Sequence, residues 1–255
     1  MNLMLVERHE IDGSPRGGRI RLTDRRADHV RRVLRSSVGD RLRVGLIGGT
    51  RGQAHVAAID DDSVELVLDL DDAPAPIPSI DLIVGLPRPQ ALHRVLQFAT
   101  AFGIRRLHLT NAWRVEKSFF QSPSVTDEAI RRQLWLGAEQ GATTHLPEVT
   151  KEPLLVPFLR HLDDAVPTTR LIAHPTADRT IEEVVPATIP TAERFLVAIG
   201  PEGGWIDREL TTFGEEGFVP VRLGPWILKV EAAVTATLAQ LELLRRQHGA
   251  ASVAC

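Results

Sequence analysis

A continuously apolar run that empties into a glycine-rich turn constrains this chain more than any other stretch. Residues 195–199 read Phe-Leu-Val-Ala-Ile, as expected of a central strand covered on both faces. Residues 200–204 follow as Gly-Pro-Glu-Gly-Gly, and such glycines allow a positive φ and expose backbone N–H groups. Asp207 then offers an N-cap for a helix. In open α/β sheets ligands bind at such strand ends, although a tight connection without a ligand is the alternative.

A second loop has the same character. Residues 219–223 form a predicted strand, and residues 224–231 read Gly-Pro-Trp-Ile-Leu-Lys-Val-Glu before an alanine-rich helix that runs to about residue 247. Two Gly-Pro turns at two strand ends can face one pocket. Neither turn matches the dinucleotide or the P-loop phosphate pattern, so the sequence does not indicate a nucleotide of those classes.

Composition narrows the class of protein. Of the 255 residues 43% are hydrophobic and 25% are charged, which is typical of one large or two modest globular domains. The single cysteine is Cys255, and no histidines stand at metal-ligand spacing, so we expect no disulfide and no metal. No apolar run approaches the roughly 18 residues of a membrane span, and we expect a cytoplasmic protein.

The chain divides into two predicted domains. Residues 1–72 contain short strands at 40–47, 53–59 and 63–70, which suggest a small β-barrel. A helix at 24–35 would turn Ala27, Val30, Val33 and Leu34 toward the core and arginines outward. Residues 73–79 form a proline-rich linker. Residues 80–255 alternate strands with helices, the pattern of a mostly parallel α/β sheet; strands are predicted at 80–86, 106–110 and 170–174, and helices at 91–102 and 126–141.

Basic charge is concentrated near the amino terminus. The whole chain has a net charge of −3, yet residues 16–51 hold eleven arginines against three aspartates, a local balance of +8. Such a surface attracts RNA phosphates, and Arg25, Arg32 and Arg35 are the predicted contacts. The alternative is a solvated face in a chain that generally uses Arg over Lys.

The two glycine loops together resemble the RsmE family of SPOUT methyltransferases, which methylate N3 of a 16S ribosomal RNA uridine. The first motif is Ile-Gly-Pro-Glu-Gly-Gly at 199–204, and the second is Leu-Gly-Pro-Trp-Ile-Leu-Lys-Val-Glu-Ala-Ala at 223–233. Residues 171–175 are similar to the family's first pocket loop, and residues 28–35 and 38–40 to its PUA-like RNA-binding domain. The resemblance spans nearly the whole chain.

This resemblance implies a PUA-like β-barrel followed by a trefoil-knotted SPOUT domain, which binds S-adenosyl-L-methionine (AdoMet) and pairs as a homodimer. It also implies that the substrate is 16S rRNA, within the small subunit. The cofactor would be held by three strand-end loops: His174, Pro175, Ile199, Gly200, Gly203, Gly204, Leu223, Gly224, Ile227 and Leu228.

Four charged residues are candidates for catalysis. Uracil N3 is a weak acid, so a carboxylate base or a cation beside the developing anion would both help. Glu202 and Glu231 are candidates for the first role, and Lys229 and Arg114 for the second. Each has an ordinary alternative: Glu202 would cap the next helix, Glu231 would favour the start of the last helix, and the cations would be surface charges.

The second motif departs from the family pattern. Trp226 and Lys229 replace two arginines, and Ala232 replaces a threonine. Trp226 could stack on an RNA base where an arginine held a phosphate. Two alternatives therefore stay open, a SPOUT methyltransferase for another RNA site and a non-catalytic RNA-binding paralogue, although retention of Glu202 and Glu231 disfavours the latter.

Overall fold

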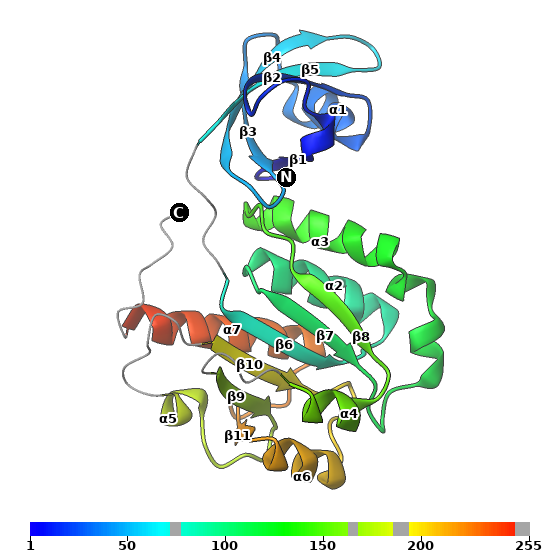
Figure 1. The fold of residues 1–255 in the computed structure, drawn as a ribbon, viewed down its shortest axis with the longest axis vertical. Coiled ribbons are helices and arrows are strands. Elements are labelled where there is room, and N and C mark those ends of the chain that lie inside the picture. Colours follow the sequence, from blue (N-terminus) through cyan, green and yellow to red (C-terminus); the bar gives the residue numbers. More distant parts are fainter. Residues whose placement is uncertain (72–77, 163–167, 186–193, 248–255) are drawn as a thin grey trace. The chain divides into compact units, whose positions relative to one another are not determined.

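A computed structural model describes residues 1–71, 78–162, 168–185 and 194–247 (Figure 1). The chain forms two compact units, one of Met1–Pro76 with Trp135–Leu146 and the other of Ile77–Leu134 with Pro147–Cys255. Most of the predicted linker at 73–79 lies outside the described residues. The sequence did not suggest that residues 135–146 join the first unit.

Unit 1 contains a five-stranded half-barrel sheet in the order β1-β3-β4-β5-β2. The three predicted strands are confirmed as β3, β4 and β5, whereas β1 and β2 were missed. β1 is only three residues long, and β2 begins Arg-Gly-Gly-Arg with an irregular register between Arg16 and Arg19, which obscures its alternation. The bounds are Met4–Val6 (β1), Arg16–Leu22 (β2), Arg41–Leu46 (β3), Arg51–Ile59 (β4) and Val64–Leu70 (β5).

The predicted arginine-rich helix is present, but its apolar face is narrower than expected. It comprises α1 (Arg25–Asp28) and a π-helical continuation, η2 (His29–Leu34). Ala27 and Val30 are buried, as predicted, while Val33 is 66% and Leu34 47% exposed. The prediction was wrong for the last two because π-helical i→i+5 bonding widens the turn and rotates later residues off the buried face.

Unit 2 contains a six-stranded sheet in the order β11-β9-β10-β6-β7-β8, with every strand pair parallel. The predicted parallel sheet is thus confirmed, and β10 lies inside it with residues 195–199 fully buried. The edge strand β8 was missed because its five residues, Glu-Val-Thr-Lys-Glu, include one apolar side chain and none of them is buried. The bounds are Ile80–Gly85 (β6), Arg106–Thr110 (β7), Glu148–Glu152 (β8), Thr168–Ala173 (β9), Arg194–Ile199 (β10) and Val219–Val221 (β11).

Helices cover both faces of this sheet. Figure 1 shows α2 on one side and α4 and α6 on the other, and α7 packs against α2. The bounds are Pro89–Ala101 (α2), Asp127–Gly141 (α3), Leu155–Arg160 (α4), Ile181–Val184 (α5), Asp207–Glu215 (α6) and Val230–Gln247 (α7). Short 3₁₀ turns complete the described elements at Arg8–Glu10 (η1), Lys117–Gln121 (η3) and Pro123–Val125 (η4).

The start of α6 differs from the prediction. Ile206, not Asp207, occupies the N-cap, and the Glu209 carboxylate accepts the Ile206 N–H at 2.9 Å. A glutamate three residues into the helix can satisfy this donor by reaching back, so no polar N-cap side chain is needed.

Candidate active site

A cavity of about 470 Å³ lies at the carboxyl ends of β9, β10 and β11, in unit 2. Loops after all three strands wall it, because parallel strands bring their carboxyl ends to one edge of the sheet. All ten residues predicted to hold a cofactor line this cavity, as do Arg114, Glu202, Trp226 and Lys229. The structure therefore gathers into one place residues that lie up to 115 positions apart, from 114 to 229.

The glycines bring bare backbone to the cavity wall. Gly204 has a φ of 71°, which side chains other than glycine rarely adopt. A Cβ on Gly203 would lie 2.9 Å from the Arg114 Cβ, and one on Gly200 would lie 3.2 Å from the Gly204 Cα. Gly224 differs, since a Cβ there would meet nothing within 4 Å. The first loop needs its glycines for close packing, whereas Gly224 leaves open space.

Trp205 is a cavity residue that the sequence reasoning missed. Its side chain is buried, and its indole N–H has no partner among the described residues. An unpaired buried donor is costly, and a ligand in the cavity could accept it. The available signal was its place directly after Gly204. Pro201, Ala173, Val230 and Ala233 also line the cavity without having been predicted.

Arg114 and Glu202 are both anchored by backbone groups. Arg114 comes from the loop after β7, and its guanidinium donates to the Gly203 carbonyl. Glu202 accepts the Arg88 N–H at 3.0 Å, and Arg88 is the N-cap residue of α2. Glu202 therefore supports α2 and not the helix that follows it in sequence, for which Glu209 does this work.

Lys229 and Glu231 occupy different environments although they are two residues apart. Lys229 is exposed and lines the cavity. Its ammonium makes no hydrogen bond or ion pair among the described residues, so it is free to meet a ligand. Glu231 does not line the cavity. Its side chain is 13% exposed and pairs with Arg94 of α2 at 3.2 Å. This geometry favours a positioning role for Glu231 over direct contact with a reacting atom.

Apolar side chains stand exposed at the cavity mouth. Trp226 is 80% and Ile227 84% exposed, while Leu228 is 40% exposed. Large apolar groups grouped in this way on a surface usually mark a binding site.

The three predicted RNA contacts in unit 1 are not equivalent. Arg25 donates two hydrogen bonds, of 2.9 and 3.0 Å, to Glu139, whose side chain is only 3% exposed. Trp135 donates a third bond to the same carboxylate at 2.9 Å. The side chain of Arg32 is 77% exposed and lies 3.6 Å from Asp28. Arg35 is exposed, and its side chain makes no hydrogen bond or ion pair among the described residues. Arg32 and Arg35 are therefore available to phosphates, whereas Arg25 stabilises the fold.

Among the described residues no three His, Cys, Asp or Glu side chains converge as a metal site would require. None of their helices combines the length and apolar character needed to cross a membrane.

An all-parallel α/β sheet whose strand-end loops enclose a cavity defines a small-molecule-binding domain of the doubly covered α/β class. Comparison with known families makes this specific. Residues 73–242 match the family described as RNA methyltransferase domain, and residues 22–69 match the RNA methyltransferase PUA domain. The chain belongs to the RNA methyltransferase family.

Relatives and solved structures agree with this assignment. The chain is 27% identical over 241 residues to the ribosomal RNA small subunit methyltransferase E of Treponema pallidum, covering 94% of this chain and 90% of that protein. It is 23% identical to the Bacillus subtilis protein of the same name, covering 88% and 91%.

A crystal structure of the Neisseria gonorrhoeae methyltransferase E bound to S-adenosyl methionine superposes with a TM-score of 0.73 at 20% identity, covering 96% of this chain and 98% of that one. These likenesses confirm the predicted fold class, a SPOUT-type domain preceded by a PUA-like domain.

Proposed function

We propose that this chain transfers the methyl group of AdoMet to N3 of a uridine in 16S ribosomal RNA. The observation that carries the proposal is the cavity in which three strand-end loops meet Arg114, Glu202 and Lys229. Relatives named ribosomal RNA small subunit methyltransferase E support the substrate class, and two neighbours solved with S-adenosyl methionine support the cofactor.

The cavity fits this cofactor on its own chemistry. Ile199, Leu223, Ile227 and Leu228 supply apolar walls, and the glycines expose N–H and C=O groups that can bind adenine and ribose. The buried Trp205 indole N–H remains to be paired. When bound, AdoMet supplies an electrophilic methyl group on a sulfonium. The chain's residues then need to orient the uracil, exclude water and favour loss of the N3 proton.

Two cations and one carboxylate are placed for this chemistry. Lys229 and Arg114 would stabilise the negative charge that develops on the uracil as the N3 proton leaves. Glu202 lines the same cavity, and among the described residues its carboxylate accepts a bond only at Oε1, from the Arg88 N–H, so Oε2 is free to accept the N3 proton. We assign Glu231 to positioning, through Arg94.

Recognition of the RNA would involve both units. Arg32 and Arg35 would bind phosphates, and Trp226 would stack on a base near the cavity. We also propose a cytoplasmic homodimer that acts on the small subunit. Ile227, which is 84% exposed at the cavity mouth, supports an apolar interface there.

Nucleoside mass spectrometry of ribosomal RNA tests this proposal. Cells lacking the gene should lose 3-methyluridine from 16S rRNA and regain it when the gene is restored. Loss of a different methylated nucleoside would instead favour a methyltransferase for another RNA site, which the replacement of an arginine by Trp226 makes the second candidate. An unchanged nucleoside profile would favour the non-catalytic alternative.

A further inference from the structure

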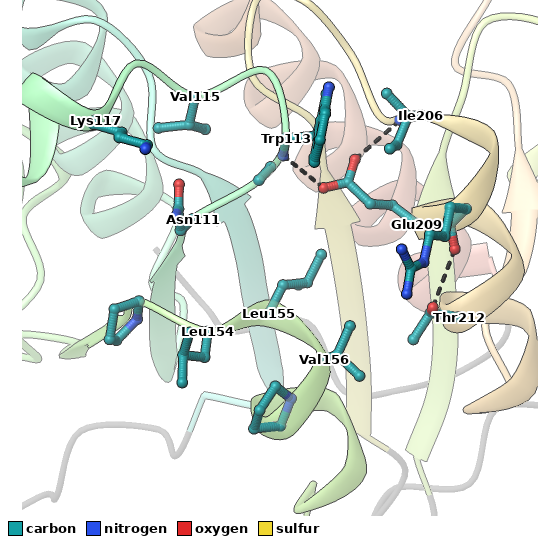
Figure 2. Close-up of a pocket in the computed structure, with 14 residues that line it drawn as sticks. Asn111, Trp113, Val115, Lys117, Leu154, Leu155, Val156, Ile206, Glu209 and Thr212 are labelled. Atoms are coloured by element: carbon teal, nitrogen blue, oxygen red, sulfur yellow. Dashed lines mark hydrogen bonds between the residues drawn. The ribbon is translucent and has the colours of Figure 1, made fainter.

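A second cavity, of about 450 Å³, opens in unit 2 at the carboxyl ends of β7 and β8 (Figure 2). It lies on the same edge of the parallel sheet as the cofactor cavity, the edge where α/β proteins bind ligands. β6 separates the strands that lead to the two cavities. Its volume is in the range of small-ligand pockets, and none of the residues predicted for cofactor or RNA lines it.

The lining combines an aromatic face, apolar walls and free polar groups. Figure 2 shows Leu154, Leu155 and Val156 on one side of the cavity and Trp113 and Ile206 on another, with Lys117 beside Val115. Trp113 is 80% and Leu154 64% exposed. The side chains of Asn111, Lys117 and Arg208 make no hydrogen bond or ion pair among the described residues. The cavity thus offers a stacking surface, an amide and two cations.

Only one carboxylate lines this cavity, and it is already used. Glu209 accepts the Trp113 N–H at 2.8 Å and the Ile206 N–H at 2.9 Å, with one oxygen for each. These bonds fix the backbone of the Trp113 loop against the start of α6. The aromatic residue is therefore exposed on a rigid support, and the remaining charge in the lining is positive.

Trp113 and Arg114 connect the two cavities along the chain. Trp113 lines the second cavity, and the next residue, Arg114, lines the cofactor cavity and donates to the Gly203 carbonyl. A ligand in the second cavity would therefore lie close to one in the first. An RNA strand that delivers one base to the methyl group must place its neighbouring nucleotides just beside the cofactor cavity.

We propose that the second cavity binds a nucleotide that flanks the methylation target in single-stranded RNA. Its base would stack on Trp113, its edge would meet the Asn111 amide, and its phosphate would bind Lys117 and Arg208. This inference rests on the proposed function, because it requires an RNA substrate. It adds a site that holds the strand in register while the target base occupies the catalytic cavity.

The test measures RNA binding by the full chain without cofactor. The probe is a nine-nucleotide single-stranded RNA with one uridine beside 2-aminopurine, whose fluorescence is quenched on stacking. We expect Trp113→Leu to raise the Kd roughly 5- to 140-fold and to abolish the quenching, because stacking is worth roughly 1–3 kcal/mol per base. Trp113→Phe, which keeps an aromatic ring, should retain most of both signals.

A double Lys117→Gln and Arg208→Gln variant tests the phosphate contacts independently, and it answers the question even if Trp113→Leu does not fold. We expect the negative slope of log K against log salt to become shallower by roughly 0.7 for each lost contact. Arg160→Gln, at an exposed arginine on α4 outside the cavity, is the control for a charge lost elsewhere and should leave the slope steeper than that of the double variant.

The proposal is overturned if Trp113→Leu and the double variant both bind the probe with the wild-type Kd, quenching and salt slope. Calorimetry with AdoMet separates this inference from the proposed function. Failure of the wild-type chain to bind AdoMet would count against the proposed function alone, since the RNA measurement needs no cofactor.

Discussion

The guanidinium of Arg94 lies 3.2 Å from the carboxylate of Glu231 and so ties the middle of α2 to the first turn of α7. Lys229 precedes that turn and lines the cofactor cavity. The pair therefore fixes the point at which the second glycine loop enters its helix. If its role is positioning, the two partners should act as a unit.

We predict that Glu231→Gln and Arg94→Gln each lower the single-turnover methylation rate by a similar factor, of about 5 to 30, and that the double variant is no slower than either. Residues in contact commonly couple by about 0.5–3 kcal/mol. AdoMet affinity and the shape of the pH–rate profile should remain those of the wild type. A strong loss with Glu231→Gln alone, together with a lost acidic limb in the profile, would make Glu231 the base instead.

Lys229→Met should remove the free cation at the cavity while keeping the length and apolar stem of the side chain. We expect the single-turnover rate to fall by about 10²–10³, the usual effect of deleting one group that stabilises transition-state charge. Calorimetry should show little change in AdoMet affinity. The exposed Arg160→Gln is the comparison for a charge lost elsewhere, and a wild-type rate in Lys229→Met would move catalysis to Arg114 or Glu202.

Gly224→Val should abolish AdoMet binding without unfolding the chain. A Cβ at Gly224 meets no atom within 4 Å, so the added side chain would not clash with protein. The φ of 159° is one that side chains rarely adopt, so the substitution would also strain the loop that lines the cavity. Gly217→Val is the matched control, since Gly217 also has a positive φ, of 78°, and an open Cβ position but does not line the cavity. Undiminished AdoMet affinity in a folded Gly224→Val variant would mean that the cofactor lies elsewhere.

Arg25 should matter for stability, and Arg32 and Arg35 for RNA. Arg25→Ala would leave the buried Glu139 carboxylate with the Trp135 indole as its only side-chain donor among the described residues. We expect this to lower the free energy of unfolding by about 1–3 kcal/mol. Arg32→Ala and Arg35→Ala should leave Tm unchanged and should each make the negative salt slope of RNA binding shallower by roughly 0.7–0.9. Thermal melts and salt titrations of the three variants check this, and equal behaviour of all three would contradict it.

His108 should make the stability of the chain depend on pH. Burial lowers the pKa of His108 below its ordinary 6.5, although nearby Asp81 and Glu152 act in the opposite direction. The unfolded chain therefore binds this proton more readily. The stabilising contribution is complete above about pH 6.5 and is lost as the pH falls through the lowered pKa of the folded state.

Wild-type Tm should consequently fall more steeply from pH 7.5 to 5 than the Tm of His108→Gln, which cannot titrate at this position. Parallel curves for the two proteins would show that His108 is not responsible.

The sequence by itself determined the local elements and the composition of the cofactor loops. Continuous apolar character marked β10, glycines marked the turns that follow the strands, and all ten predicted cofactor residues line one cavity. The strand and the turns depend on a residue's nearest neighbours in the chain and are therefore readable without a fold, whereas the ten cofactor residues were assigned through the resemblance to the family. β1 has only three residues, too few to show a period, and β8 has no buried residue and so lacks an apolar pattern, which is why both were missed.

Only the tertiary structure decided which charges are free to act. Glu231 pairs with Arg94, 137 positions away, Arg25 pairs with Glu139, 114 positions away, and Glu202 accepts a backbone bond from Arg88. Trp113 faces a second cavity only because parallel pairing places the ends of β7 and β8 side by side. A sequence pattern can name a charged or aromatic residue as a candidate, but its role depends on partners that folding brings from distant parts of the chain.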